Sequence, residues 1–515
     1  MNTMKTMKDE PKSTGLEVPV IDSQRLKAQA LEHYEAFNIH RYSDHPEVKG
    51  VAEHIYEELN ALCDSKHNKR IWVKHLVVIV LDLFMKWSKD PSLFTSFSRG
   101  EGAYKPKSRY NETKVSKLIP KIIDSLVIAG YVIQHTGYID RIKGKSRLSR
   151  MIATPKLINL LTIRFQVTED MAELSPQTEC IILRDIDERS IRIDVEYEDS
   201  SDVRIDTWRH DLCAYNNLLR STRIEVPSYP KDGIPSRDSE KPIKISLHDK
   251  FVRRIFNNAS WQDGGRFYGG WWQNIPKKWR EKITIFSHPV TEIDYSGLHI
   301  NLLYALKGIS YTHDPYQLEG LEQTERMRSF LKKILLSAIN AENETKATMS
   351  VQKAINFNPE ELGWVNGFEL NTTEIINRFA EQHKPIREYF FSGFGVKLQN
   401  MDSLIAEKIV NHFTRRQIPV LCVHDSFLIR ADKAVELNEV MDSSFVETLL
   451  ELQIDTQHIP KTKVEGVGLR QPYIVTTDLL RSRDIVEIIE NPYERPSWWG
   501  QVEQNDNWEV KEYYR

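Results

Sequence analysis

The chain has 515 residues, of which 40% are hydrophobic and 28% are charged, and its formal net charge is −3 at pH 7. This length predicts roughly three domains, and the balanced charge excludes nucleic-acid binding through bulk electrostatics alone, so such binding would need local basic patches. The four scattered cysteines form no CxxC pair and no apolar run reaches the ~18 residues of a membrane span, which argues against a structural zinc site, a disulfide framework and a membrane protein, and favours a reducing, cytoplasmic setting.

The N-terminal part of the chain predicts a short tail followed by helices. Residues 1–25 are polar, and we expect them to be disordered. Residues 26–165 are expected to form a mainly helical region. Its run IWVKHLVVIVLDLFMKW is apolar nearly all round, which is typical of a buried core helix.

Within that region, a helix followed by a basic β-hairpin resembles a winged helix. Apolar residues repeat at helical spacing from Val115 to Leu126, and Gly130 is placed to cap the helix. The stretches YVIQHTGYIDR and SRLSRMIAT predict two strands joined by the basic turn IKGKS. The alternative to nucleic-acid binding is a solvated hairpin that contacts other proteins. Five basic residues fall within ten positions that hold no acid, and they could neutralise phosphates: Arg141, Lys143, Lys145, Arg147 and Arg150.

Residues 166–250 predict an α/β connecting or thumb-like region. Two short strands, CIILRDID and SIRIDVEYED, precede a helix around HDLCAYNNLLRS. The polar stretch DGIPSRDSEKPIK, rich in turn residues, then predicts a linker. We expect the functional domain over residues 251–470. The tail over residues 471–515 is aromatic and acidic, and it could pack on that domain or hold a partner.

Two stretches early in the 251–470 domain carry candidate functional residues. The glycine-rich stretch DGGRFYGGWWQNIPKKWR brings arginine beside aromatic side chains, which suits a sugar-phosphate backbone or a base edge; the alternative is a loop with a buried tryptophan pair. In VTEIDYSGLHINLLYALKG, a strand ends on Asp294 and Gly297 opens the turn into a helix. A carboxylate at that point can face a metal ion or cap the helix.

Two later stretches supply cations and a second carboxylate. In ERMRSFLKKILLSAINAEN, Arg328 and Lys332 lie one helical turn apart on the same face, where they could bind a triphosphate or form a solvated basic surface. In VLCVHDSFLIR, Asp425 interrupts an apolar strand–turn–strand pattern. Burying a lone carboxylate costs several kcal/mol unless a metal ion or an arginine compensates its charge.

Taken together, these stretches predict a two-metal site. Asp294 and Asp425 both lie at strand ends. If the two strands are neighbours in one sheet, the carboxylates can hold two Mg²⁺ ions, with Mn²⁺ as a substitute, for phosphoryl transfer. The basic helix lies between the two aspartates in the sequence.

The order of these motifs resembles that of the right-hand template-directed polymerases, in particular the family-A DNA polymerases and the phage-type single-subunit RNA polymerases. GRFYGGWWQNIP is similar to the family-A pattern GR-L-x-S…LQNIP, IDYSGLH to the first palm motif, and RSFLKKILLSAIN to the fingers-helix motif R-x-x-x-K. DPYQL and LQNMDSLIAEKIV resemble two intervening elements, and VHDSF resembles the second palm motif, with the serine of the RNA polymerases. The resemblance covers about residues 260–435 and implies an α+β fold with a palm and fingers.

The resemblance implies a role for each matching residue. Asp294 and Asp425 would ligate the catalytic metals, and the backbone carbonyl of Tyr295 would complete one coordination shell. Arg328 and Lys332 would bind the incoming triphosphate, and Lys332 would protonate or neutralise the pyrophosphate leaving group.

The remaining matches fall on the nucleic-acid side. Arg266 would contact the primer–template duplex, and Gln399 would lie near the template or primer. His424 would steady the primer 3′ end, whose hydroxyl attacks the α-phosphate.

Two positions depart from the family-A pattern. His299 stands where the family has a glutamate that crowds the 2′-position of the sugar. Asn340 stands where it has an aromatic residue that selects the sugar or stacks on the base. These departures leave the choice between dNTP and rNTP open.

The favoured interpretation is a template-directed nucleotidyltransferase, specifically a DNA polymerase, because QNIP and DYS have the family-A form. Its partners would be a DNA primer–template and nucleoside triphosphates. HDSF, RSFLKK and the missing glutamate support an RNA polymerase or primase instead. A third interpretation is a non-catalytic DNA-binding replication initiator built on the winged helix. A fourth is a hydrolase that uses Ser426 and His424, but the sequence offers no group to orient the histidine.

Overall fold

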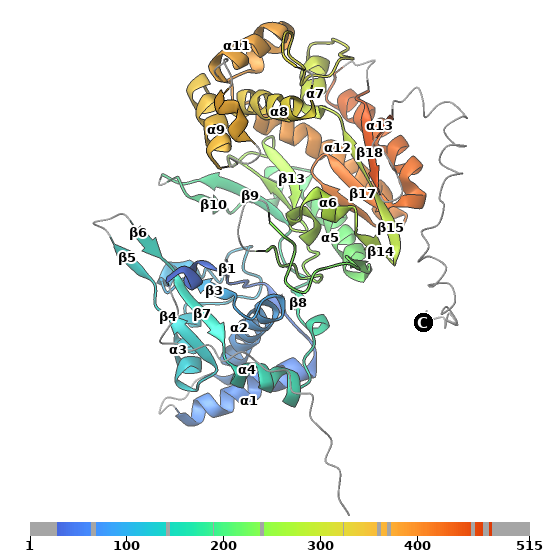
Figure 1. Ribbon diagram of the computed structural model, residues 1–515. Helices are drawn as coiled ribbons and strands as arrows, with labels where there is room; N and C mark the ends of the chain where they lie inside the picture. The colour runs from blue at the N-terminus through green and yellow to red at the C-terminus, as the bar shows by residue number, and fades with distance from the viewer. Residues whose placement is uncertain are drawn as a thin grey trace, which may run out of the picture. The chain divides into compact units, whose positions relative to one another are not determined.

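The computed structural model describes residues 28–62, 68–140, 145–188, 190–236, 242–322, 324–357, 362–367, 372–454, 459–466 and 473–475. They form an α+β protein that divides into two compact units (Figure 1). Unit 1 comprises Met1–Glu179 with Lys244–His248, and unit 2 comprises Cys180–Ile243 with Asp249–Arg515. The tails predicted over residues 1–25 and 471–515 lie outside the described residues, apart from residues 473–475. No helix in these ranges is both long and apolar enough to cross a lipid bilayer.

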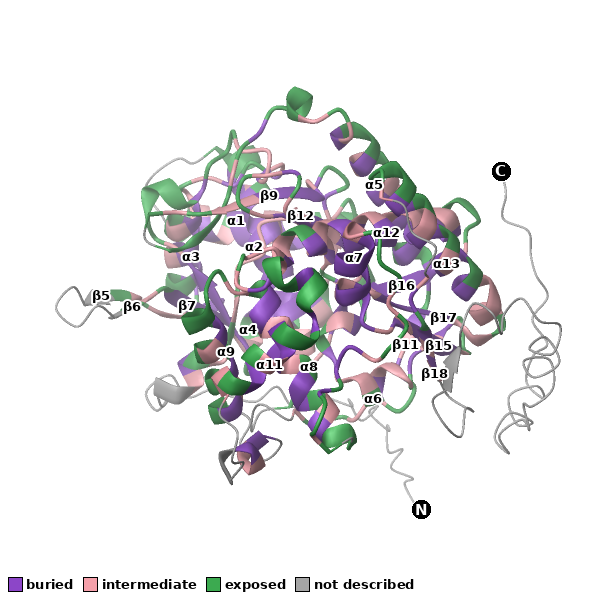
Figure 2. Ribbon diagram, turned by 90° about the horizontal axis from the view of Figure 1, so that it is seen from above, coloured by how far each residue is buried: buried purple, intermediate pink, exposed green. Residues whose placement is uncertain are grey.

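Unit 1 is built on a buried helix and a small mixed sheet. Helix α2 carries the apolar run, and its buried side chains extend around most of the helix (Figure 2), as the all-round pattern predicted. The one acid within the run, Asp82, forms a buried ion pair with Lys86 at 2.8 Å. The helices and strands of this unit are β1 (Tyr34–Ala36), β2 (Arg41–Tyr42), α1 (Pro46–Leu62), α2 (Lys69–Lys89), β3 (Phe94–Phe97), α3 (Ile119–Ile128), β4 (Val132–His135), β5 (Tyr138–Asp140), β6 (Lys145–Arg147), β7 (Ser149–Ala153), α4 (Pro155–Asn159) and β8 (Glu173–Leu174).

The predicted helix and β-hairpin are both present in unit 1. Helix α3 is followed by Gly130, whose φ of +77° is the left-handed conformation of a helix C-cap. Strand β4 pairs with β7, and β5 pairs with β6. The four strands therefore form two consecutive segments of one hairpin. Strand β7 also pairs with β3, which places the base of the hairpin within the sheet β1-β3-β7-β4.

Unit 2 contains two sheets and a group of helices. Helices α7, α8, α9 and α11 gather on one side of it (Figure 1). Its helices and strands are β9 (Ile181–Ile186), β10 (Arg192–Asp194), α5 (Ile205–Ser221), β11 (Ile224–Glu225), β12 (Arg253–Phe256), β13 (Gly264–Tyr268), α6 (Lys277–Arg280), β14 (Thr284–Ile285), β15 (His288–Tyr295), α7 (Leu298–Leu306), α8 (Glu325–Asn340), α9 (Glu344–Phe357), α11 (Thr372–Gln382), α12 (Gly395–Arg415), β16 (Val420–Val423), β17 (Ser426–Arg430), α13 (Ala434–Glu451), β18 (Thr462–Gly466) and β19 (Tyr473–Val475).

The first sheet of unit 2 has the strand order β10-β9-β12-β13. Strand β12 pairs in parallel with β9 and antiparallel with β13. The boundary expected at residue 250 therefore falls inside unit 2, because β9 comes from the region predicted as a separate connector. The glycine-rich stretch forms β13, and the tryptophans after it, Trp271 and Trp272, are buried.

The second sheet places the two aspartate motifs on neighbouring strands. Strand β15 is central, with β17 on one side and β18 on the other, both antiparallel. Strands β16 and β17 pair as a hairpin with a two-residue loop at residues 424–425. Gly297, with φ of +68°, turns the chain from β15 into α7, as the sequence predicted.

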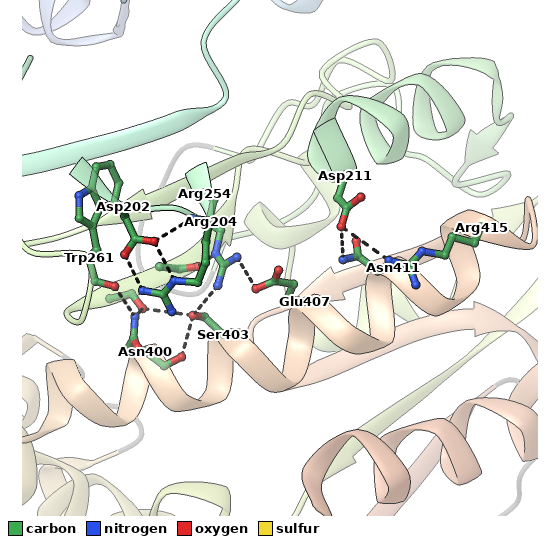
Figure 3. A network of polar contacts seen from close by, with 12 residues as sticks. Asp202, Arg204, Asp211, Arg254, Trp261, Asn400, Ser403, Glu407, Asn411 and Arg415 are labelled. Carbon is green, nitrogen blue, oxygen red and sulfur yellow. Dashed lines mark hydrogen bonds and ion pairs between the residues drawn. The ribbon is translucent and has the colours of Figure 1, made fainter. Parts of the chain in front are cut away.

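Buried polar contacts fasten helix α12 to the first sheet (Figure 3). Arg254 of β12 is 1% exposed, and it donates to the carbonyl of Gly265 at 2.8 Å and to Glu407 of α12 at 2.5 Å. At the other end of α12, the exposed Arg415 lies 3.9 Å from Asp211 of α5. The Arg254–Glu407 pair is shielded from water and the Arg415–Asp211 pair is not. We therefore expect the loss of the first pair to lower the free energy of unfolding far more than the loss of the second.

Replacing Arg254 with alanine should destabilise unit 2 by about 3–5 kcal/mol, because the change leaves the carboxylate of Glu407 without its buried partner. The matched control is Arg415→Ala, for which we expect a change of at most ~0.5 kcal/mol. Urea unfolding followed by tryptophan fluorescence compares the two variants. Equal unfolding midpoints would show that the buried pair does not hold α12 in place.

Candidate active site

Two aspartates meet where β15 and the β16–β17 hairpin come together. Asp294 is the second-last residue of β15, and its register partner on β17 is Ser426, the residue that follows Asp425. The backbone N–H of Tyr295 donates to the backbone carbonyl of Asp425 over 3.5 Å. The strands are therefore neighbours in one sheet, which was the condition that the sequence set for a shared site.

The hairpin turn between β16 and β17 is held from several sides. His424, in its two-residue loop, has a φ of +62°, a region that few non-glycine residues adopt. The carbonyl of Cys422 accepts from Nε1 of Trp272 at 3.1 Å and from the side-chain amide of Gln273 at 2.9 Å. The ring of Tyr268 meets the His424 imidazole edge-on, with 5.2 Å between their centroids. These contacts keep a strained backbone in place.

The charges around the two aspartates are unbalanced. Burial, and after it the negative charge of Asp425, raise the pKa of Asp294 well above its ordinary value, while the positive charge of Lys332 opposes the shift. Tyr316 is buried beside the pair, and its pKa is raised by burial and by the charge of Asp425. A carboxylate forced toward its protonated form by a neighbouring carboxylate is one that a bound cation would return to its ionised form.

Helix α8 presents its two cations to the same region. Nζ of Lys332 lies 5.5 Å from the ring centroid of Tyr316, and its charge acts on Asp294. The guanidinium of Arg328 lies 5.0 Å from the same ring and forms an ion pair with Asp314 at 2.5 Å. The sequence predicted both cations on one face of the helix. Asp314, which belongs to DPYQL, is the partner that an anionic ligand of Arg328 would have to displace.

Arg266, His299 and Asp402 form a buried cluster close to the hairpin turn. Nε of Arg266 donates to both carboxylate oxygens of Asp402 at 3.0 Å, and Nε2 of His299 lies 2.8 Å from the same carboxylate. Nε2 of His299 also lies 3.1 Å from Nη2 of Arg266, which only donates, so the ring nitrogen faces both a donor and an acceptor. Nδ1 of His299 is buried without a hydrogen-bond partner among the described residues. The duplex contact expected of Arg266 and the sugar contact expected of His299 stay predictions.

A second buried group centres on Glu292, which lies two residues before Asp294 on β15. Its contacts give Ser426 a structural role. The hydroxyl of Ser426 donates to Glu292 at 2.7 Å, and Arg280 forms an ion pair with the same carboxylate at 2.7 Å. Glu292 is 3% exposed. A hydrolase would need the hydroxyl to donate to His424 instead, so this arrangement argues against the hydrolase interpretation.

Three other predicted residues have contacts or positions that leave their roles untested. The side chain of Tyr295 points into the core, where its hydroxyl donates to the carbonyl of Met441 at 2.5 Å, so only its backbone could serve a metal. Asn340 ends α8 and donates to the carbonyl of Leu336 at 2.7 Å. Gln399 is partly exposed on the first turns of α12. The described contacts join neither Gln399 nor Asn340 to the aspartates, and their roles stay predictions.

The basic hairpin of unit 1 is described in part. Lys143 lies outside the described residues, and of Lys145 only the backbone is described, at the start of β6. Arg147 stacks its guanidinium on Tyr138, 5.3 Å from the ring centroid. Arg150 is 3% exposed and donates to two backbone carbonyls. The prediction that Arg150 joins a phosphate-binding cluster is therefore wrong, because the pairing of β7 with β3 turns it inward.

Three residues that position the site were not singled out from the sequence. Asp402 had a usable signal, since an acid stands between Leu398 and Ile405 where helical spacing predicts an apolar side chain. Tyr316 and Gln273 lie within recognised motifs. These two residues contact elements that are distant in the sequence, and no local sequence pattern predicts those contacts.

The donor set fits a hard divalent cation. Asp294 and Asp425 supply two carboxylates, and Mg²⁺ commonly takes one or two from a protein and its other ligands from water and substrate phosphates. No group of three or more His, Cys, Asp or Glu side chains in the described ranges is placed to hold a metal ion.

No protein-family model matches the chain, and no curated protein sequence is similar to it. Among solved structures, the chain is similar to the polymerase domain of Pol1 from M. smegmatis in complex with a DNA primer–template and dNTP. The TM-score is 0.24 and the sequence identity 11%, over 43% of this chain and 48% of that chain. The match thus spans less than half of that domain, and it assigns neither a family nor an activity.

A buried histidine holds the loop that carries Asp314. His383 follows α11 and is 0% exposed, and its ring nitrogens lie 3.0 Å from the hydroxyl of Tyr304 and 3.3 Å from the carbonyl of Pro315. Burial lowers its pKa from 6.5 to about 4. The neutral imidazole therefore ties α7 and α11 to the loop beside Arg328.

We expect this histidine to make the fold sensitive to acid. Between pH 6.5 and about 4, the unfolded chain binds a proton that folded His383 does not, so stability falls as the pH drops through that window. The difference corresponds to roughly 3 kcal/mol at most. His383→Gln should be less stable than the wild type at pH 7 but lose less stability on acidification, as measured by urea unfolding across the window. Equally steep losses in both proteins would assign the acid sensitivity to other groups.

Proposed function

We propose that this chain is a template-directed nucleotidyltransferase, with a DNA polymerase as the favoured form. The pairing of β15 with β17 carries the proposal, because it puts Asp294 beside Asp425 while the charge of Lys332 acts on the pair from α8. A pair of carboxylates can hold two metal ions for nucleotidyl transfer, and a nearby lysine can neutralise charge on the transferred phosphates.

Asp294 and Asp425 would hold the cations, Mg²⁺ or in its place Mn²⁺, and the backbone carbonyl of Tyr295 would add a further oxygen. Ions bound there would stabilise the attacking and leaving oxygens of the phosphoryl transfer. Asp294 must be ionised to serve as a ligand, so binding would release the proton that its raised pKa favours.

Lys332 and Arg328 would bind the triphosphate. The ammonium of Lys332 would neutralise the departing pyrophosphate or give it a proton. Arg328 would exchange the carboxylate of Asp314 for phosphate oxygens, which its planar guanidinium binds in the same bidentate manner. Helices α8 to α11 would then correspond to the fingers, and the second sheet of unit 2 to the palm.

The remaining side chains would face the nucleic acid. Burial, and after it the positive charge of Arg266, lower the pKa of His424, so its ring is neutral near pH 7 and can hydrogen-bond to the primer 3′ end. Gln399 would lie near the template or primer. The hairpin of unit 1, with Lys143 and Lys145, would act as a wing that binds the phosphate backbone.

One observation favours an RNA polymerase or primase as the second candidate. Nδ1 of His299 is buried without a hydrogen-bond partner in the described part of the chain, while Nε2 of the same ring contacts Asp402. If the sugar lies there, Nδ1 could form a hydrogen bond with a ribose 2′-hydroxyl, which can donate or accept. A family-A glutamate at this position would instead crowd that hydroxyl.

Asp425→Asn should reduce nucleotide incorporation by about a thousandfold, because a catalytic metal ion is worth several kcal/mol of transition-state stabilisation. Asparagine keeps the shape of the turn but removes one of the two charges that would hold the ions. The measurement is gel-resolved extension of a labelled primer on a template with Mg²⁺, with dNTPs and rNTPs in separate lanes. Asp432→Asn, an exposed acid after the same hairpin, is the matched control.

The Asp425→Asn protein should still bind the primer–template duplex nearly as well as the wild type. Wild-type incorporation by this variant would contradict the two-metal site. If the wild type extended no primer in any lane yet bound the duplex, the DNA-binding replication initiator would become the better interpretation.

The sugar preference is tested by exchanging charges within the buried cluster. His299→Glu combined with Asp402→Asn keeps a single carboxylate near Arg266 and places it where it would crowd the 2′-position. We expect a shift toward dNTPs of about tenfold in the ratio of kcat/KM values, equivalent to ~1.4 kcal/mol of discrimination. Asp402→Asn alone is the control. A ratio equal to that of the control would remove residue 299 from sugar selection.

A further inference from the structure

The register of the first sheet of unit 2 aligns side chains across its four strands. Arg253 of β12 is paired with Tyr268 of β13, and Ile255 of β12 with Ile182 of β9. Directly paired residues share a face and alternate residues return to it, so Arg184 points to the same side as Arg253. Strand β10 continues the pattern. The following side chains therefore share one face, here termed the basic face: Arg184, Arg192, Arg253, Arg266 and Tyr268.

Helices cover the opposite face of this sheet. Phe256 stacks on Trp208 of α5 with 4.8 Å between ring centroids, and Arg254 pairs with Glu407 of α12. The basic face is the other side of the sheet, and α12 reaches it only at the edge strand β13, where Asp402 pairs with Arg266. Figure 1 shows strands β9 and β10 extending from the body of unit 2.

The basic face carries more positive than negative charge. Arg192 is exposed and Arg184 is partly exposed. Asp194 shares the face and pairs with Arg184 at 2.8 Å, and Asp402 pairs with Arg266 from α12. Four guanidinium groups thus stand against these two carboxylates, and the excess is divided between Arg192 of β10 and Arg253 of β12.

The basic face is continuous with the candidate active site. Tyr268 contacts the ring of His424 in the turn that carries Asp425. Burial raises the pKa of Tyr268, whereas the positive charges of Arg266, Arg184 and Arg192 lower it. The two arginines of the β9–β10 hairpin are therefore close enough to act electrostatically on the edge of the site.

We propose that the basic face binds the sugar-phosphate backbone of the nucleic-acid duplex that extends from the aspartate site, with Arg184 and Arg192 contacting phosphates. The inference rests on the proposed function, which supplies the duplex. Four strands ~4.8 Å apart span about 14 Å, or roughly four nucleotides at 3.4 Å each along one strand of a duplex. The β9–β10 hairpin would thus meet the duplex a few nucleotides from the primer end.

Two features favour nucleic acid over an acidic protein as the occupant. Guanidinium groups bind phosphate oxygens bidentately, and contacts of this kind position a duplex without reading its sequence. The basic face also begins at Tyr268, which contacts the turn that carries Asp425, where the primer end would lie. Its arginines then lie on successive strands away from that turn. An acidic protein partner would not explain why the basic face adjoins this turn.

The test compares two double variants that each remove two positive charges from unit 2. Arg184→Gln with Arg192→Gln alters the basic face. Arg223→Gln with Arg415→Gln is the matched control, since these side chains are 65% and 75% exposed outside the basic face. Binding of a fluorescent DNA primer–template is measured by anisotropy over a salt series, without divalent metal. We expect the slope of log K against log salt to become shallower by about two in the first variant, at ~0.9 for each lost phosphate contact, and to stay unchanged in the control.

A lysine variant, Arg184→Lys with Arg192→Lys, keeps both charges and should restore most of the salt slope. Equal slopes in the glutamine variant and the control would overturn the proposal, and it would do so even if the wild type extends primers. If the wild type extends no primer but the slope still falls selectively, the basic face is supported and the proposed catalytic function fails.

Discussion

The antiparallel pairing of β15 with β17 is the constraint on which the site depends. It sets Asp294 opposite Ser426, and a slip of one residue would turn Asp294 to the other side of the sheet. The contacts of Glu292 with Ser426 and Arg280, both at 2.7 Å, hold this register, because a slipped strand would leave a buried carboxylate without partners. The buried carboxylate of Glu292 thus stabilises the β15–β17 register in which Asp294 lies opposite Ser426, the residue after Asp425.

Helix α12 is fixed by the same kind of interaction. Arg254 and Arg266 come from the neighbouring strands β12 and β13, and each pairs with an acid of α12, Glu407 and Asp402 respectively. The helix cannot slide or rotate without breaking both buried pairs. Because Asp402 also holds His299 at the start of α7, the first sheet, α12 and α7 are locked together beside the aspartate turn.

Local patterns in the sequence were enough to predict the parts of the site. The strand that ends near Asp294, the left-handed Gly297 and the hairpin at Asp425 each depend on a short stretch of chain, and each is confirmed. The errors and omissions depend on long-range contacts. Arg150 resembles its basic neighbours in sequence but faces inward because β7 pairs with β3, and β9 joins β12 in parallel across an intervening helix and loop. The role of Asp402 can be recognised only from the folded structure, in which it contacts Arg266 and His299.

The aspartate pair differs from the buried acids of the described residues. Asp82, Glu292 and Asp402 each form an ion pair with a lysine or arginine, which compensates the cost of removing the charge from water. Among the described residues, neither Asp294 nor Asp425 has such a partner, and the negative charge of Asp425 raises the pKa of Asp294 instead of compensating it. The β16–β17 turn that carries Asp425 is also strained, with a positive φ at His424. Strain and like charge both lower stability, and a cation bound between the two carboxylates would relieve the repulsion. In the part of the chain that the structure describes, this contrast is the physical reason for choosing the aspartate pair as the candidate site.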